Sequence, residues 1–425
     1  MENERFARMQ KTTRLHLGME ATETLQRLTD FPDQPKAMDY FYDFFRRTFA
    51  DGLTLPPRPA EQKVIGTMCL QVPDELIVAA GAKPLRLCSG AYAFDQVGAE
   101  MLPAKSCPLV RATTGMLHAN HPDWGRELAA VVIPTTCDQK KKCGEMIATM
   151  PYPVYNLEMP STKDSEASRL YWQESVKQFT LDLQGITGRK ITARSLQAAI
   201  TQGSAASALF RRLDDLRKSG GPVIFGKDIF LVTSGYFIDD PERWGNAVHH
   251  LITELEERKQ AGLTVGNRAA PRLLLTGSPP IFPNLKVPIL VEQSGGVIVA
   301  DEVCSSNRLL SDGVAYDQVT LNDMVPAVAD RALKPCTCPC LTPNHDRSRR
   351  LVELIRDRGI EGVVYQAFSG CLPYEMEQRQ INTTLSGIGV PMLYLETDYS
   401  PEDQGQLATR IEAFIESIIA RRRKK

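Results

Sequence analysis

Short apolar runs alternate with helical stretches along most of this chain, and this alternation restricts its fold more than any other feature. The runs fall into two groups, at 64–68, 85–87, 128–134 and 154–157, and at 272–277, 296–300, 362–365 and 391–395. Strands that alternate with helices usually pair in parallel through right-handed crossovers. The sequence therefore predicts an α/β fold with two Rossmann-like parallel-sheet domains that face a central cleft.

Helical segments precede and separate the two groups of runs. Residues 1–60 carry aromatic side chains at helical spacing and end in a proline-rich stretch at 55–59, and residues 163–262 read as helices with charged faces. We therefore expect an N-terminal helical segment at 1–60, a first α/β domain with a helical insertion at 61–265, and a second α/β domain at 266–425.

The last helix has the most explicit start signal. Ser400 is expected as its N-cap, Pro401 as its first helical residue and Asp403 as the capping-box acid. Apolar side chains then recur on one face, at Leu407, Ile411, Phe414, Ile415 and Ile418. This helix is expected to close the second domain.

Composition and charge exclude several classes of protein. Lys and Arg number 50 against 51 Asp and Glu, so no net charge draws the chain to nucleic acid or to an anionic membrane. The start is charged and lacks the apolar core of a signal peptide, and no run of about 18 apolar residues follows. We expect a cytoplasmic protein, with the basic stretch 421–425 as a solvated terminus.

Ten cysteines are unusual in a reducing compartment, where disulfides are not expected, so they point to metal binding or redox chemistry. Four of them, Cys88, Cys137, Cys304 and Cys371, come just after predicted strands. The carboxyl ends of parallel strands share one edge of a sheet, where ligands bind. Two facing domains are therefore predicted to gather these thiols in one cleft.

The remaining cysteines divide into two kinds. Cys107 and the cluster of Cys336, Cys338 and Cys340 lie in connecting segments that can reach the same edge. Cys69, in a strand-like run, and Cys143, inside a predicted helix, are interpreted as small buried side chains.

Thiolate ligands alone select zinc or an iron–sulfur cluster. Structural zinc usually takes its ligands from two close pairs, whereas these cysteines are scattered over two domains, which favours a cluster held in a cleft. Glu302 and Glu375 lie near the same cleft and are candidate proton donors. The P-loop-like spacing at 221–228 has an apolar interior and Asp228 in place of a hydroxyl residue, so we interpret it as a coincidence.

Several segments resemble one known family. They are Cys88–Gly90, Ser106–Val110, Thr135–Lys142, Cys338–Asn344 and Leu395–Ser400, the last continuing to Gly405–Arg410. Together they are similar to the 2-hydroxyacyl-CoA dehydratase and benzoyl-CoA reductase superfamily, over residues 60–420. Dehydratase subunits of that superfamily are paired, non-identical chains that each hold one [4Fe-4S] cluster through three cysteines.

The surplus of cysteines makes this chain most similar to the single-chain double-cubane proteins of that superfamily. The resemblance implies a homodimer in which six cysteines per chain hold an [8Fe-9S] cluster. It also implies an ATP-hydrolysing iron–sulfur reductase that supplies low-potential electrons, and a small-molecule substrate that is reduced.

The resemblance also implies a ligand set. Cys107, Cys137 and Cys371 match the ordinary cubane, while Cys88, Cys304 and one of Cys338 or Cys340 form the additional set. Cys143 and Cys336 depart from the family pattern. Two alternatives stay open: a [4Fe-4S] subunit of a dehydratase or benzoyl-CoA reductase acting on an acyl-CoA thioester, and a non-catalytic protein with a structural zinc–thiolate site.

Overall fold

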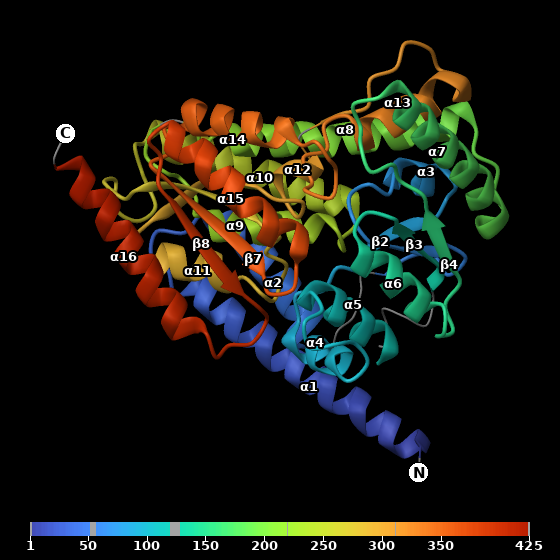
Figure 1. The fold of residues 1–425 in the computed structure, drawn as a ribbon, viewed down its shortest axis with the longest axis horizontal. Coiled ribbons are helices and arrows are strands. Elements are labelled where there is room, and N and C mark those ends of the chain that lie inside the picture. Colours follow the sequence, from blue (N-terminus) through green and yellow to red (C-terminus); the bar gives the residue numbers. More distant parts are fainter. Residues whose placement is uncertain (1, 52–56, 120–127, 219, 311, 424–425) are drawn as a thin grey trace.

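The computed structural model describes residues 2–51, 57–119, 128–218, 220–310 and 312–423, and it contains two four-stranded parallel sheets (Figure 1). The first sheet has the order β2–β1–β3–β4 and the second the order β6–β5–β7–β8. Their strands are β1 (Val64–Thr67), β2 (Lys83–Arg86), β3 (Leu128–Pro134), β4 (Val154–Leu157), β5 (Arg272–Gly277), β6 (Val297–Glu302), β7 (Gly362–Phe368) and β8 (Met392–Thr397). The predicted α/β class with two Rossmann-like sheets is confirmed.

The two sheets share one topology. In each, the chain starts at an inner strand, moves to an edge strand on one side, and returns to the other side of the first strand. The direction of winding therefore reverses between β1 and β3, and again between β5 and β7. In open α/β sheets the crevice at the carboxyl ends of such neighbouring strands is where ligands bind.

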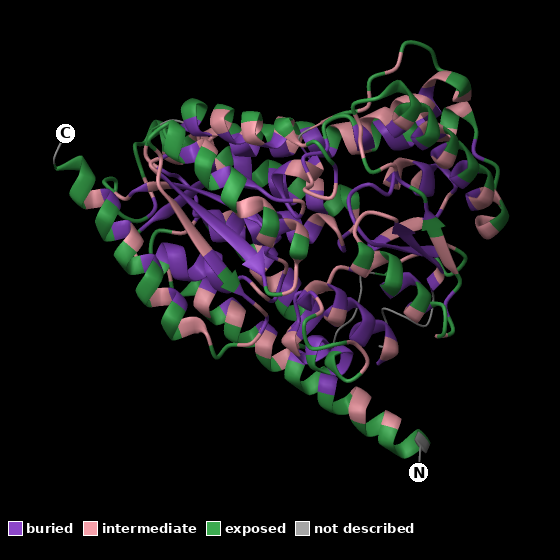
Figure 2. Ribbon diagram, in the orientation of Figure 1, coloured by how far each residue is buried: buried purple, intermediate pink, exposed green. Residues whose placement is uncertain are grey.

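Helices cover both faces of the second sheet, and its strands β5, β6 and β7 are buried accordingly, whereas the edge strand β8 is largely half-buried (Figure 2). Leu273 and Leu275 pack on the face covered by α9 (Gly226–Tyr236), α10 (Pro241–Gln260), α11 (Lys286–Gln293) and α16 (Gln404–Arg422). Leu274 and Val363 face the other way, toward α14 (His345–Arg358) and α15 (Leu372–Gly387). Burial on both faces explains why these strands are continuous apolar runs.

The helical insertion is divided between the two halves of the molecule. Helices α7 (Glu166–Thr187) and α8 (Ala193–Asp215) share an apolar core with α3 (Asp74–Ala79) and the first sheet, whereas α9 and α10 pack with the second. Helix α13 (Leu321–Leu333) crosses back to the first half, where the Trp172 indole donates a hydrogen bond to the Ala329 carbonyl over 2.8 Å. The chain therefore passes between the halves more than once.

The N-terminal helix α1 (Glu2–Thr29) touches both halves. Its Glu20 carboxylate accepts hydrogen bonds from the backbone amides of Tyr92 and Ala93, at the start of α4 (Tyr92–Ala99). One turn further along α1, the Thr24 hydroxyl donates to the Pro283 carbonyl in the second half. The short elements η1 (Lys36–Met38), α2 (Asp39–Phe45) and η2 (Arg46–Ala50) follow and bury their aromatic side chains.

The P-loop-like spacing lies at the start of α9 and serves packing. Lys227 and Asp228 are fully buried, and the Lys227 ammonium binds the Asp228 carboxylate and the Leu28 carbonyl of α1. These contacts link α9 to α1, in agreement with the interpretation of the spacing as a coincidence.

The predicted start of the last helix is wrong by several residues. Helix α16 begins at Gln404, and Asp403 is its N-cap without a capping hydrogen bond. The Asp403 carboxylate instead binds the Lys286 ammonium and the Thr397 hydroxyl, so it is not available to cap. The predicted apolar face is confirmed, since Leu407, Ile411, Ile415 and Ile418 are buried.

Two sequence features reach beyond the described residues. They are the first two residues of the proline-rich stretch, 55 and 56, and the final two residues of the basic terminus. Among the helices that the structure describes, none combines the length and the apolar character needed to cross a bilayer.

Candidate metal centre

Cysteines follow equivalent strands of the two sheets. Cys88 follows β2 and Cys304 follows β6, which occupy the same place in their sheets, and Cys137 and Cys371 follow β3 and β7, which are again equivalent. All four positions therefore lie at the carboxyl edges, as the sequence predicted.

Three of the thiols stand at helix N-termini. Cys107 is the N-cap of α5 (Pro108–His118), Cys137 that of α6 (Asp138–Ile147) and Cys371 that of α15. The unpaired amides of a first helical turn carry partial positive charge and stabilise anions. The amides of each first turn therefore offset part of the negative charge that a thiolate at these positions carries.

Cys107 and Cys371 come from different halves and are in contact. The Cys371 thiol donates a hydrogen bond to Cys107, which lowers the pKa of Cys107 despite its burial. The side chain of Gln139 fixes this junction, because its carbonyl oxygen accepts from the Cys107 amide over 2.6 Å and its amide donates to the Gly370 carbonyl over 2.6 Å. The two halves are thus joined at the predicted cubane ligands.

A second group of thiols surrounds the segment 336–340. Cys340 donates a hydrogen bond to Cys338, which lowers the pKa of Cys338 to about 6, and the Arg308 guanidinium acts in the same direction. Arg308 lies on α12 (Asn307–Leu310) and its charge also reaches Cys304, although burial raises the pKa of Cys304 to about 12. This group unites Cys304, Cys338 and Cys340, which are three of the four thiols considered for the additional set.

Cys69 belongs with this second group, although its sequence context suggested a core residue. The Cys69 thiol donates to the Gln71 side chain over 2.5 Å, and the amide of Gln71 donates to the Cys336 sulfur over 2.7 Å. Cys69 has a φ of 86°, which is rare for a residue other than glycine. The signal in the sequence was its place two residues after β1, at the same sheet edge as Cys88.

The two groups of thiols influence each other. The pKa of Cys137 is raised, mainly by burial, and the charges of both Cys107 and Cys338 contribute to this rise. The pKa of the Tyr399 hydroxyl is likewise raised by burial and by the charges of thiols from both halves, among them Cys107 and Cys304. The two groups therefore lie within electrostatic reach of each other, and they are called the thiol-lined site below.

The donor chemistry of this site fits a cluster better than a single ion. Within the described residues, no group of three or more His, Cys, Asp or Glu side chains is arranged to hold one metal ion. The cysteines are free thiols. Two buried hydroxyls beside candidate ligands, Thr136 next to Cys137 and Ser305 next to Cys304, have no hydrogen-bond partner in the part of the chain that the structure describes, and the sulfurs of a cluster would supply acceptors.

The environment of Glu302 favours its ionised form. Its carboxylate is fully buried and binds the guanidinium groups of Arg308 and Arg347 and the Thr337 hydroxyl. Burial alone would raise the pKa of Glu302, but the two guanidinium groups outweigh it and hold the pKa at about 2. Glu302 is therefore ionised and supports the segment that carries Cys338.

Glu375 also supports a ligand position. Its carboxylate accepts a hydrogen bond from the Gly370 amide over 2.6 Å, which fixes the turn before Cys371. Its place one turn after Cys371 on α15 agrees with the predicted location near the site.

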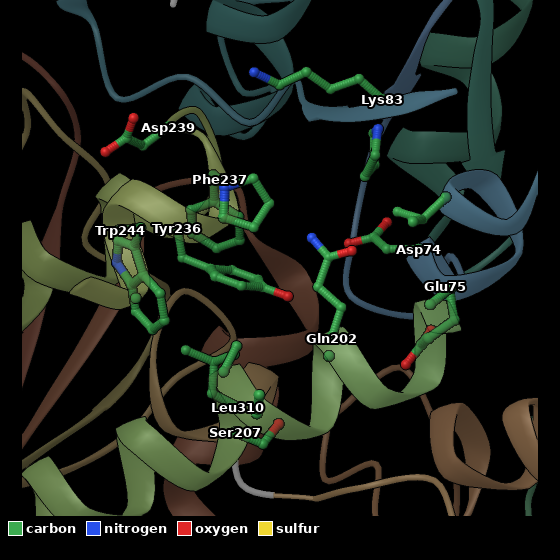
Figure 3. Close-up of a pocket in the computed structure, with 18 of the residues that line it drawn as sticks. Asp74, Glu75, Lys83, Gln202, Ser207, Tyr236, Phe237, Asp239, Trp244 and Leu310 are labelled. Carbon is green, nitrogen blue, oxygen red and sulfur yellow. The ribbon is translucent and has the colours of Figure 1, made fainter. Parts of the chain in front are cut away.

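A cavity of about 880 Å³ lies behind Cys69 and is shared by the two halves. The Arg86 guanidinium forms part of its wall, where it binds the Cys69 carbonyl and the Asp74 carboxylate and lies 5.6 Å from the centre of the Phe237 ring. Figure 3 shows the side chains of Tyr236 and Gln202 directed into this space from α9 and α8. The cavity is large enough for a small organic ligand.

A family profile described as "2-hydroxyglutaryl-CoA dehydratase, D-component" matches residues 69–418. The chain belongs to this family. The match covers strands β2 to β8 and every candidate cysteine, so it confirms the resemblance seen in the sequence. Membership makes the chain an enzyme of the dehydratase and reductase type.

Named relatives support this membership. The chain is 29% identical to the dehydratase-type subunit YjiM of Escherichia coli over 91% of this chain and 99% of that protein. It is 24% identical to the (R)-phenyllactyl-CoA dehydratase beta subunit of Clostridium sporogenes, over 84% and 92% of the two chains. It is 23% identical to one of the subunits of benzoyl-CoA reductase from Thauera aromatica, over 81% and 87%.

Proposed function

We propose that this chain is a cytoplasmic, homodimeric iron–sulfur enzyme that holds an [8Fe-9S] double-cubane cluster and reduces a small substrate. An ATP-hydrolysing iron–sulfur protein supplies its low-potential electrons. The enzyme class rests on the family, whereas the cluster type, the oligomeric state and the electron donor are the proposal.

The observation that carries the proposal is the presence of two linked groups of thiols. Cys107, Cys137 and Cys371 suffice for one cubane, because each cubane has four iron corners and one is left for another ligand. Two cubanes that share a bridging sulfide leave six corners for protein thiolates. Cys88, Cys304 and one of Cys338 or Cys340 supply the other three, and Cys69 is a further candidate from the same group.

The chain's own groups would hold and tune such a cluster. Amides at the starts of α5, α6 and α15 point toward the thiols and offset negative charge. The Arg308 guanidinium does the same for the second group of thiols. When bound, the cluster would supply low-potential electrons. The substrate would bind in the cavity whose wall includes Arg86, the residue that contacts the Cys69 carbonyl.

Iron and sulfide analysis of anaerobically prepared protein tests the proposal. We expect about eight iron atoms per chain. In a Cys371→Ala variant we expect at least half of this iron to be lost, because the second half no longer contributes its thiol beside Cys107. Cys143→Ala is the control: this thiol is buried inside α6 against the Thr114 hydroxyl, and its removal is expected to leave the iron content unchanged. About four iron atoms in the wild-type protein would remove the double cubane.

The names of the relatives favour a second candidate function. Several are single subunits of dehydratases or of benzoyl-CoA reductase, so this chain is alternatively a [4Fe-4S] subunit that acts on an acyl-CoA thioester. Co-purification of a different protein chain with about four iron atoms per chain would support this candidate. Zinc without iron would overturn both in favour of a structural zinc–thiolate site.

A further inference from the structure

Three consecutive lysines lie in the first turns of α6, and their surroundings differ. The Lys141 ammonium lies 3.5 Å from the Asp138 carboxylate and the Lys142 ammonium 2.8 Å from Glu145, and both side chains are exposed. Lys140 is half-buried, and within the described residues its ammonium has neither a carboxylate nor a hydrogen-bond partner. Lys140 therefore lacks the local compensation that its two neighbours have.

The first turn of α6 faces the thiol-lined site. Cys137 is its N-cap, Gln139 binds the junction between Cys107 and Gly370, and the Lys140 amide donates a hydrogen bond to the Cys137 sulfur. These contacts place the backbone of Lys140 at the edge of the site, and its side chain is half-buried there.

Thiols of both groups act on the Lys140 ammonium. Cys69, Cys137, Cys88 and Cys338 lie within electrostatic reach of the Lys140 ammonium, and its positive charge also reaches Cys107 and Cys304. Because the Lys140 ammonium has no paired carboxylate among the described residues, thiolates that hold a cluster are the anions that its charge would meet.

We propose that the Lys140 ammonium is a fixed positive charge of the thiol-lined site and that it raises the reduction potential of the group held there. This inference rests on the proposed function, since it needs an iron–sulfur cluster at these thiols. Reduction adds one electron and hence one negative charge to the cluster, and a neighbouring cation stabilises the reduced form more than the oxidised form. Lys140 is thus a positioning residue that acts through charge and binds no metal.

A redox titration followed by electron paramagnetic resonance tests the role of this charge. In anaerobically prepared full-length protein, Lys140→Gln is expected to shift the midpoint potential of the cluster to a more negative value, with the iron content unchanged. Lys142→Gln removes the same charge from an exposed, paired position on the same helix and is expected to leave the potential unchanged. Lys140→Arg keeps the charge and is expected to stay close to the wild-type potential.

The outcomes separate this inference from the proposed function. Wild-type protein without iron would overturn both. Iron in the wild-type protein and an unchanged potential in Lys140→Gln would overturn only the role of Lys140. If Lys140→Gln loses its iron while Lys140→Arg retains it, the requirement for a positive charge is supported. Loss of iron in both variants would show that Lys140 acts through packing and would overturn the inference.

Discussion

Glu302 and Cys304 lie two residues apart at the end of β6, and their surroundings give them different chemistry. The Glu302 carboxylate is enclosed by Arg308 and Arg347, which keep it ionised, while burial holds Cys304 in its neutral thiol form in the absence of a cluster. Position relative to a strand therefore identifies the edge of the site, and the neighbours of each side chain decide its role.

The pKa of Glu302 predicts how its contribution to stability depends on pH. Its folded-state pKa is about 2, below its ordinary value of 4.5, so the unfolded chain takes up the proton first as the pH falls. The contribution is present in full above about pH 4.5 and is lost as the pH falls toward 2. For a buried group this difference corresponds to on the order of 3 kcal/mol.

Chemical denaturation of metal-free protein measures this contribution. We expect Glu302→Gln to be destabilised by roughly 3 kcal/mol at pH 7, because two buried guanidinium groups lose their counter-charge, and this difference to shrink at pH 3. Glu353→Gln, at an exposed position on α14, is the control and is expected to change stability little. A difference that is independent of pH would contradict this account of Glu302.

At the scale of the elements, two glycines let the halves approach each other beside the thiols. A Cβ atom on Gly370 would lie 2.1 Å from the Lys105 carbonyl oxygen, and one on Gly90 would lie 1.8 Å from that of Ile281. Gly370 also has a φ of 82°, a conformation that L side chains rarely adopt. Strand ends and helix starts from different halves are therefore held together by direct backbone contact.

Replacement of Gly370 is expected to separate the two halves at the candidate ligands. In Gly370→Ala the new methyl group pushes the start of α15 away from the segment before Cys107, so we expect the iron content to fall by more than half. Gly387→Ala, at the other end of α15, has no atom within 4 Å of the added carbon and is expected to keep its iron. Equal iron content in the two variants would contradict the proposed junction.

At the scale of the whole molecule, two sheets of the same topology meet through their carboxyl edges, and α1 and α13 tie the halves together from outside the site (Figure 1). The candidate ligands come from both halves. A cluster bound by all of them would therefore cross-link the molecule and bind only its folded state.

Removal of the cluster is accordingly expected to lower the stability of the whole molecule. Metal-free protein should unfold several degrees below the cluster-bound form, because a ligand that binds only the folded state shifts the unfolding equilibrium. Differential scanning calorimetry under anaerobic conditions measures the two transitions. Hydrogen exchange should show the largest loss of protection around 105–107, 137–140 and 370–375, and an unchanged transition temperature would contradict ligation from both halves.

The sequence by itself determined the eight strands, the α/β class and the place of the thiols, because these depend on local periodicity. An apolar run sets a strand, and the residue after it must lie at the sheet edge, so Cys88, Cys137, Cys304 and Cys371 were located without knowledge of any contact. The family profile confirmed the resemblance carried by their motifs.

Only the tertiary structure decided which groups meet. The contact of Cys107 with Cys371, the inclusion of Cys69, the counter-charges of Glu302 and the late start of α16 all depend on residues distant in the chain. Electrostatic and hydrogen-bond energies act through space, whereas sequence patterns report neighbours along the chain. For that reason the edge of the site was predictable from the sequence, and the partners that set the chemistry of each residue there were not.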